Sequence, residues 1–387
     1  MDDMDELIKK YFKLGYSQVE IAATLTSRYN INLSVRQLQR ELQRLELYRH
    51  KNQTDMAQVR RFIERQLQAS GELHGYRWMH HKLLQAGMVA SRETVRRTLL
   101  ELDPDGVNLR KRRRLVRRRY SGRGPNFVWH LDAMDKLKPF GIGISGCIDG
   151  FSRKIIWLEA NSTTNDPEYI GGFFLKAVDR LGGCPTLVRS DRGTENGHVG
   201  AFQRFLRHHD DALGGDKSYL TGRSTANQRI ESWWGQLRKQ CTEFWRTLFR
   251  WLLEEGFFTG DVMDKELIRF VFMKHIQGDL DAVAEVWDGH LIRKSKQEHV
   301  THGRPLLMFQ LPEVYGTRDH LKPVEQERID LCREECNFKD RFPCDRELFE
   351  YCCQSLITNG WEDPRNPEAA MNLYINLREH VRREIGV

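Results

Sequence analysis

Residues 186–196 read TLVRSDRGTEN, a short apolar run and the turn that follows it, with two acids and two arginines among eleven residues. Thr186, Leu187 and Val188 favour a buried strand, because β-branched and aliphatic side chains pack well on a pleated surface. Asp191 comes directly after that strand. Taken alone, the stretch fits a solvated turn and a metal site equally well, so acids elsewhere in the chain have to decide.

The chain around this stretch reads as a central α/β domain over residues 126–255. Strands are expected over residues 127–132, 142–148, 154–159 and 186–190. Helices are expected over residues 167–181 behind Asp166 and a first-turn proline, over 199–208, and over 225–253 behind a cap at Ser224. The resulting order is βββαβαα, with one crossover helix before the fourth strand.

Three carboxylates stand at positions in this order that a folded sheet could bring together. Asp132 ends the first strand, Asp191 follows the fourth, and Glu231 lies two turns into the last helix. If the first and fourth strands are neighbours, the two aspartates emerge at one edge of the sheet, and a helix packed there adds Glu231. Such acids repel one another when ionised unless divalent cations bridge them, and hard cations prefer oxygen ligands. Asp135, three residues beyond Asp132, is an alternative ligand.

Two Mg²⁺ or Mn²⁺ ions on Asp132, Asp191 and Glu231 are therefore predicted. Paired ions of this kind activate an attacking oxygen and stabilise the leaving oxygen of a phosphodiester.

Four segments carry a resemblance to a known family: WHLD at 129–132, CIDGFSRKI at 147–155, SDRGTEN at 190–196 and GRSTANQRIESWW at 222–234. Together they resemble the catalytic core of retroviral-type integrases and DDE transposases, which has an RNase H-like fold. Asp132 and Asp191 are separated by 58 residues, and Asp191 and Glu231 by 39. The His-His-Cys-Cys zinc domain of retroviral members and their small C-terminal barrel are not seen, so the chain resembles eukaryotic, transposon-type members.

The resemblance also assigns roles to individual residues. It implies that Asp132, Asp191 and Glu231 are the catalytic metal ligands, and that Asp149 and Ser152 form a structural turn. It implies that Glu195 braces the loop after Asp191. DNA contacts are expected from Gln228, Arg229 and Arg238, whereas Gly235 stands where the family pattern has a second basic residue.

Residues 1–50 and 54–107 read as two all-helical units of the helix-turn-helix type. Ser17 with Glu20, and Ser34 with Gln37, form capping boxes at two helix starts. SVRQLQREL from Ser34 resembles SRETVRRTL from Ser91, a weak repeat. Exposed side chains near the starts of the second helices are expected to read duplex DNA. They are Arg36, Gln37 and Arg40 in the first unit, and Arg92, Arg96 and Arg97 in the second. Two small three-helix bundles without this function are the alternative.

Residues 108–125 form a basic linker, in which nine of the fourteen residues from Arg110 to Arg123 are Lys or Arg and none is acidic. The run is expected to lie along DNA phosphates, and it also fits a solvated linker or a nuclear-import signal. The phosphate contacts are expected from six of its arginines. They are Arg112, Arg113, Arg114, Arg117, Arg118 and Arg119.

The 387 residues carry a net charge of +7, but residues 256–387 hold 18 Lys and Arg against 24 Asp and Glu. The positive excess therefore lies in the first 255 residues, which are the part expected to bind a polyanion. Residues 256–387 are expected to form a helical C-terminal region. No apolar run reaches membrane-spanning length, and the eight scattered cysteines favour free thiols over a disulfide framework, although Cys332 and Cys336 also suggest a metal knuckle.

The sequence thus predicts a multidomain nuclear protein that cleaves and joins double-stranded DNA and acts as a homo-oligomer. A domesticated DNA-binding or adaptor protein that kept the integrase fold without transposition is the alternative. A nuclease acting on RNA–DNA hybrids is a third possibility, which the helix-turn-helix units disfavour because such units read duplex DNA grooves.

Overall fold

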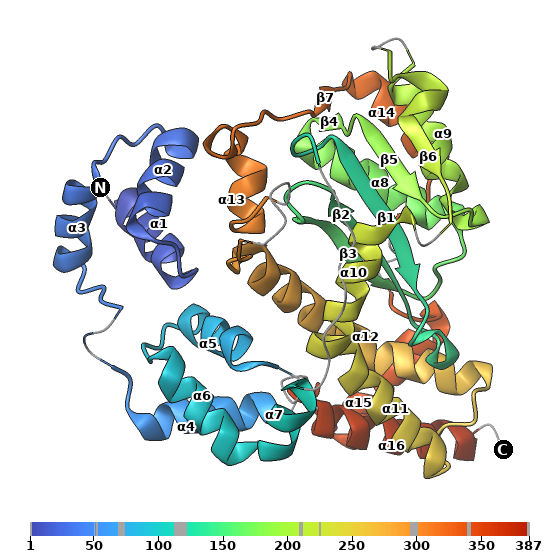
Figure 1. Ribbon diagram of the computed structural model, residues 1–387. Helices are drawn as coiled ribbons and strands as arrows, with labels where there is room; N and C mark the ends of the chain where they lie inside the picture. Colours follow the sequence, from blue (N-terminus) through green and yellow to red (C-terminus); the bar gives the residue numbers. More distant parts are fainter. Residues whose placement is uncertain are drawn as a thin grey trace. The chain divides into compact units, whose positions relative to one another are not determined.

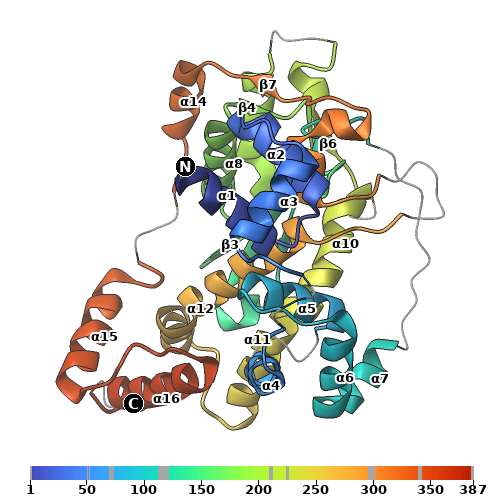
Figure 2. The same cartoon turned by 90° about the vertical axis from the view of Figure 1, so that its left-hand side faces the viewer.

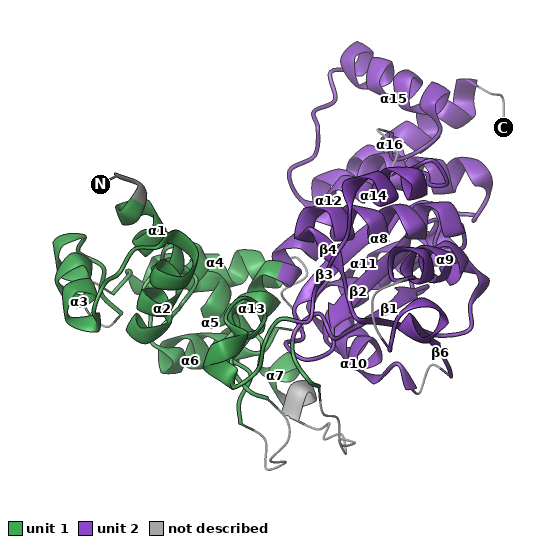
Figure 3. Ribbon diagram, turned by 90° about the horizontal axis from the view of Figure 1, so that it is seen from above, with its two compact units in different colours: residues 1–124, 285–319 green, residues 125–284, 320–387 purple. Residues whose placement is uncertain are grey.

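The computed structural model describes residues 2–49, 51, 53–68, 74–111, 122–208, 212–223, 226–294, 301–338 and 342–384. The chain forms two compact units, coloured separately in Figure 3. Residues 1–124 and 285–319 make the first, and residues 125–284 and 320–387 make the second.

The first unit begins with three short helices, α1 (Asp2–Lys13), α2 (Gln18–Tyr29) and α3 (Val35–Arg44). Both predicted capping boxes are confirmed, with Ser17 and Ser34 each accepting a bond from the backbone three residues on. Leu38 and Leu42 of α3 are buried, as their spacing predicts. Leu307 and Leu311, from α13 (Pro305–Gln310) and the residue after it, complete this core.

Three further helices follow, α4 (Met56–Leu67), α5 (Tyr76–Gln85) and α6 (Arg92–Leu102), and then the short α7 (Pro104–Lys111). They have an apolar core of their own, in which Val59, Ile63, Met79 and Val95 are fully buried. The helical unit expected over residues 54–107 is confirmed, since the apolar positions of these helices recur at helical spacing.

Arg304 ties the returning segment 285–319 to the first three helices. Its Nε donates to both carboxylate oxygens of Glu20, at 3.0 and 3.1 Å. Its two terminal nitrogens donate to the carbonyls of Gly289 and Gly15, and the guanidinium lies 5.3 Å from the ring centre of Tyr16. Because Glu20 also closes the capping box of α2, one carboxylate serves both a local and a long-range contact.

The second unit is built on a five-stranded sheet in the order β3-β2-β1-β5-β6 (Figure 1). The strands are β1 (Val128–Met134), β2 (Gly143–Asp149), β3 (Ile155–Asn161), β5 (Leu187–Ser190) and β6 (Tyr219–Thr221). β1, β2 and β3 are antiparallel neighbours, whereas β5 runs parallel to β1 and β6 runs parallel to β5. The four predicted strands are confirmed. β6 was not predicted, because three residues are too few to show an alternating pattern.

Three helices pack on this sheet: α8 (Pro167–Leu181) against β3, α9 (Gly197–Leu206) against β5 and β6, and α10 (Gln228–Leu237) against β1 and β2. Asp166 caps α8 by accepting from the backbone of Glu168, with Pro167 in the first turn, as predicted.

The long helix predicted over residues 225–253 is confirmed in its main part, but it begins three residues later and contains a π-helical segment. α10 begins at Gln228, a π-helical segment occupies Arg238–Thr242, and α11 (Glu243–Glu254) follows. Ser224, the predicted cap, lies outside the described residues. Asn227 stands at the N-cap without a side-chain bond to the helix. Its side-chain amide is committed to β1 instead, which sets where α10 begins.

The rest of the second unit is mainly helical. α12 (Val262–Gly289), of which residues 262–284 belong to this unit, is followed by α14 (Gln326–Arg333), α15 (Arg346–Asn359) and α16 (Pro367–Glu384). A two-stranded sheet pairs β4 (Gly183–Cys184) with β7 (Lys322–Pro323). α15 lies beside α16 (Figure 2), where Tyr351 donates to Glu384 at 2.7 Å. Asp264 of α12 is fully buried and is paired with Arg378 of α16 at 2.8 Å.

Candidate active site

Asp132 and Asp191 come together through the pairing of β1 with β5. The two strands are parallel, and their register sets His130 beside Arg189. Two residues further along each chain stand Asp132 and Asp191. Continuing the register therefore brings the two aspartates level at the carboxyl ends of adjacent strands, as the sequence predicts.

Glu231 is held near this edge by an anchor at the start of α10. Asn227 Nδ2 donates to the carbonyl of Leu131 at 2.7 Å, and Asn227 Oδ1 lies 2.8 Å from Nδ1 of His130. Burial lowers the pKa of His130 to about 3, so the ring is neutral and donates its Nδ1 proton to the amide oxygen. Glu231 lies one turn after Asn227, and this anchor therefore fixes its distance along the helix from β1.

Trp234 supplies a second link between α10 and the sheet. Its Nε1 donates to Oδ2 of Asp132 at 2.8 Å. Gly146 of β2 pairs with Asp132 across the antiparallel ladder, and a Cβ on Gly146 would stand 2.6 Å from the Trp234 ring. The indole thus lies against the sheet only because position 146 has no side chain. Glu231 and Trp234 are three residues apart and share one face of the helix.

The three carboxylates act on one another electrostatically. Burial first, and then the negative charges of Glu231 and Asp191, raise the pKa of Asp132 to about 7 against the hydrogen bond from Trp234. Burial, and then the charge of Asp191, also raises the pKa of Glu231. Both shifts have the direction expected of acids that lie near other acids without a counter-charge.

The loop after β5 is held by side chains of its own and by the unpredicted strand β6. Asp191 Oδ1 accepts from the backbone N–H of Gly193 at 3.2 Å and from Nδ2 of Asn196 at 3.1 Å. The same Asn196 amide donates to Glu195 at 2.8 Å, so Glu195 does brace this loop. Tyr219 of β6 bonds Ser190 at 2.7 Å and donates to the Asn196 carbonyl at 3.2 Å.

Asp149 and Ser152 form the structural turn that the resemblance implies. Asp149 is fully buried, and its Oδ2 accepts from the backbone and the hydroxyl of Ser152, both at 2.7 Å. Its Oδ1 accepts from the backbone of Asn126 at 2.8 Å. A carboxylate satisfied in this way is committed to the fold and is not a candidate metal ligand.

Asp135, the alternative to Asp132, lies outside β1 and has other partners. Thr164 donates to its Oδ1 at 3.1 Å, and Lys138 approaches its Oδ2 at 3.5 Å. Its side chain is 56% exposed. The strand position and the burial both favour Asp132 as the site acid.

The donor set suits a hard divalent cation, since it consists of carboxylate oxygens without a cysteine or a histidine. Among the described residues, no group of three or more His, Cys, Asp and Glu side chains has the arrangement of a ready-made metal cage.

The predicted DNA contacts on α10 and beyond have partners within the fold. Arg229 Nε donates to the carbonyl of Gly150 at 2.8 Å, and Arg238 lies 3.7 Å from Glu243. Gln228 is half-buried at the first position of α10. Their role in DNA contact stays a prediction.

The predicted DNA-reading residues of the first unit are all exposed, but they differ in their partners. Arg36, Arg40 and Arg92 have no acidic partner among the residues that the structure describes. Gln37 accepts from Ser34 to close the capping box. Arg96 and Arg97 both bond Glu93, at 2.7 and 2.9 Å, and these bonds lower the pKa of Glu93 to about 2.

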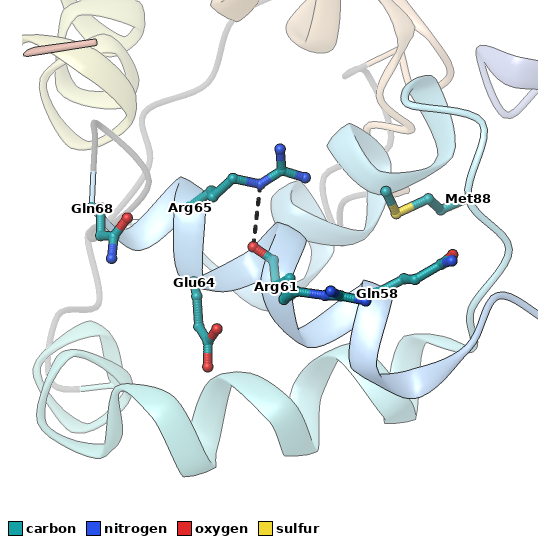
Figure 4. Close-up of a pocket in the computed structure, with 6 residues that line it drawn as sticks. All are labelled: Gln58, Arg61, Glu64, Arg65, Gln68 and Met88. Carbon is teal, nitrogen blue, oxygen red and sulfur yellow. Dashed lines mark hydrogen bonds between the residues drawn. The ribbon is translucent and has the colours of Figure 1, made fainter.

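A groove along α4 presents two arginines that, unlike Arg96 and Arg97, are not paired with an acid in the described part of the chain (Figure 4). The sequence analysis did not predict them. Arg61 and Arg65 are exposed, and each Nε donates only to a carbonyl of its own helix, at 3.2 and 3.4 Å. Within the described residues, neither has an acidic partner. Gln58, Gln68 and Met88 line the same groove. The spacing of Gln58, Arg61 and Arg65 is helical, a signal that was visible in the sequence.

Two other predicted features have different outcomes. Arg112, Arg113, Arg114, Arg117, Arg118 and Arg119 lie outside the described residues. The cysteines form no disulfide, and burial raises the pKa of Cys332 to about 11. The alternative of a metal knuckle stays untested.

The mixed sheet carries acids at the carboxyl ends of β1 and β5, and the helix packed on it adds a third. Residues 119–304 match the family model described as the integrase core domain, so the chain carries an integrase-type core. No curated protein matches the chain. Of the helices that the structure describes, none is long and apolar enough to cross a membrane.

Proposed function

We propose that this protein catalyses metal-dependent DNA strand cleavage and strand transfer, with Asp132, Asp191 and Glu231 as its metal ligands. The observation that carries the proposal is the placement of three acids at one edge of the sheet. Asp132 and Asp191 stand at the ends of adjacent parallel strands, and Glu231 lies on α10, which is bonded to β1 through its own side chains. The integrase core domain that spans these residues supports it, because this family consists in general of polynucleotidyl transferases.

Divalent cations, when bound, would activate the attacking oxygen and stabilise the leaving oxygen of the scissile phosphodiester. Asp132, Asp191 and Glu231 would hold them. Trp234 would act as a positioning residue, since it donates to one oxygen of Asp132. Asn227 would act one step further out, by fixing the helix that carries Glu231.

DNA would be held by the first unit and by the basic run. Arg36, Arg40 and Arg92 would read the duplex, and Arg61 and Arg65 on α4 would contact phosphates, because their charges are not neutralised within the fold. The run of residues 110–123 would add affinity that does not depend on sequence and would direct the protein to the nucleus. Joining two DNA ends requires both to be held together, which favours a homo-oligomer.

The test is a strand-cleavage and strand-transfer assay on labelled duplex DNA with Mg²⁺ or Mn²⁺, using the wild type and Asp191→Asn. The proposal predicts nicked and joined products from the wild type alone, with loss of at least about 100-fold in the variant. DNA binding that is equal in both proteins and independent of the cation, without any cut strand, would instead identify a domesticated DNA-binding protein.

A further inference from the structure

Tyr219 is a buried tyrosine that β6 brings beside the loop carrying Asp191. Its residue is 8% exposed, and it pairs with Val188 of β5 in the parallel ladder. α9 packs on its ring. A Cβ on Gly200 would stand 3.0 Å from Cε1, and the guanidinium of Arg204 lies 5.0 Å from the ring centre. The strand and the helix together therefore fix the place of the Tyr219 hydroxyl.

This hydroxyl contacts both ends of the loop after β5. It lies 2.7 Å from Oγ of Ser190, the last residue of the strand, and it donates to the carbonyl of Asn196 at 3.2 Å. Asp191 lies between these two residues in the chain. One phenol oxygen thus links the start of the loop to its end.

Each end of the loop also has its own bond to Asp191. Ser190 Oγ donates to the main-chain carbonyl of Asp191 at 2.8 Å, and Asn196 Nδ2 donates to Oδ1 of its carboxylate at 3.1 Å. Ser190 is 1% exposed and Asn196 is 4% exposed, so water does not readily replace these bonds. The main chain and the side chain of Asp191 are therefore both bonded to residues that Tyr219 contacts.

The hydroxyls of Tyr219 and Ser190 act together, because two protons serve three contacts. These contacts join the two hydroxyls to each other, Tyr219 to the Asn196 carbonyl, and Ser190 to the Asp191 carbonyl. Each hydroxyl has one proton to donate, and two oxygens 2.7 Å apart need a proton between them. Each arrangement therefore satisfies the link between the hydroxyls and one of the two carbonyls. Removing the Tyr219 hydroxyl releases both ends of the loop at once.

We propose that Tyr219 is a positioning residue for Asp191, which it holds through Ser190 and Asn196 in the geometry that cation binding requires. This role rests on the proposed function, because it takes Asp191 as a metal ligand. It adds to the site a residue from β6, a strand that contributes none of the three acids. Trp234 bonds Asp132 directly, whereas Tyr219 acts on Asp191 through intermediates.

The test compares two tyrosines that each lose only a hydroxyl. Tyr219→Phe removes the group that links the ends of the loop. Tyr374→Phe is the matched control, because Tyr374 is also buried in the second unit and donates to a carbonyl, that of Phe257, at 2.9 Å. Ser190→Ala is a second variant, which breaks the same network at its other hydroxyl.

Three quantities are measured on the full chain. The dissociation constant for Mn²⁺ comes from the paramagnetic resonance signal of the free ion. Hydrogen exchange of the amides of residues 191–196 is followed in EDTA. Steady-state kinetics of strand cleavage give kcat and the KM for DNA.

Tyr219→Phe should raise the dissociation constant for Mn²⁺ about tenfold. That is the lower end of the range for partners of a metal ligand, because Tyr219 acts through intermediates. The value of kcat should fall by a similar factor while the KM for DNA stays unchanged, and the loop amides should exchange faster. Ser190→Ala should follow Tyr219→Phe, and Tyr374→Phe should change none of these quantities.

The possible failures are distinct. Mn²⁺ affinity and kcat that are equal in the wild type and in Tyr219→Phe would overturn the role of Tyr219 and leave the proposed function standing. Faster exchange of the loop without loss of Mn²⁺ affinity would also overturn it, since Tyr219 would then only stabilise the loop. A wild type that binds no Mn²⁺ would overturn the proposed function and this role with it.

Discussion

A carboxyl group whose pKa is about 7 changes charge near neutral pH, and Asp132 is such a group. Between about pH 4 and about pH 7 the unfolded chain releases this proton while the folded protein keeps it, so the free energy of unfolding falls as pH rises through that window. The size of this fall measures the free energy that is lost when the Asp132 carboxylate is buried beside two other acids.

Asp132→Asn is expected to remove this dependence. Without a divalent cation, the variant should gain roughly 2–3 kcal/mol relative to the wild type between about pH 5 and about pH 8, since one pKa unit corresponds to about 1.4 kcal/mol. Chemical denaturation of both proteins at the two pH values, in EDTA, measures it. A difference that does not change with pH would mean that Asp132 is already ionised at about pH 5.

A substitution of Trp234 tests whether this residue positions Asp132 for catalysis or only stabilises the fold. Trp234→Phe should lower the rate of strand cleavage about 10- to 100-fold, the range seen when the outer partner of a metal ligand is removed. Trp245→Phe is the matched control, because it deletes another indole–carboxylate bond, from Trp245 to Asp279 at 3.0 Å.

Both variants should lose similar stability, but only Trp234→Phe should weaken the response of the melting temperature to Mn²⁺. Equal effects of the two variants on cleavage and on that response would show that the role of Trp234 is only structural.

Position along the chain predicts the acids of the candidate site but misses the residues that only tertiary packing brings together. Asp132 and Asp191 were predicted because each stands at the end of a strand, and Glu231 was predicted because of its spacing from Asp191. Trp234 and Gly146 were missed as a pair, since their contact depends on the register of β1 with β2 and on how α10 lies on the sheet. Nothing in the local sequence reveals such a contact.

At the scale of elements, Asn227 decides where the last helix of the core begins. Asn227→Ala would leave the Leu131 carbonyl and the His130 ring without this partner, both in a buried place. The expected loss is about 2–4 kcal/mol of unfolding free energy, since each unsatisfied buried group costs about 1–3 kcal/mol. Calorimetric melting measures it, and a loss below about 0.5 kcal/mol would show that other contacts hold α10.

The helices of the first unit offer a second comparison, between α4 and α6. Arg61→Gln with Arg65→Gln should flatten the dependence of DNA affinity on salt by about 0.9 in log–log slope for each phosphate that the protein no longer neutralises. Arg96→Gln with Arg97→Gln should do less, because Glu93 already neutralises part of that charge. Fluorescence anisotropy at several salt concentrations measures both slopes, and the reverse order would assign the phosphate contacts to α6.

Element prediction succeeded where capping and periodicity agree, as at Ser17, Ser34 and Asp166. It failed for β6, whose three residues are ordered by pairing with β5 and not by their own pattern. It found the long helix over residues 225–253 but placed its start three residues too early and missed its π-helical segment. The start is set by the bond from the Asn227 side chain to β1, a tertiary contact.

For the whole molecule, chain order and spatial grouping differ. Residues 285–319 belong to the first unit, although they follow the whole α/β core in sequence. Arg304 and the apolar residues of α13 explain this grouping, since they complete contacts that the first helices begin. A contact between residues 20 and 304 leaves no trace in local sequence patterns, so the linear division of the chain into consecutive regions did not anticipate it.

The central claim is that three acids from separate elements form one cation site. The melting temperature of the wild type and of Asp191→Asn, measured against Mn²⁺ concentration, tests it most directly. A cation that binds only the folded protein stabilises it by mass action, about 2.7 kcal/mol at 100 times the dissociation constant. The account predicts a melting temperature that rises with Mn²⁺ in the wild type and stays nearly flat in Asp191→Asn. Two curves that rise together, or neither rising, would contradict it.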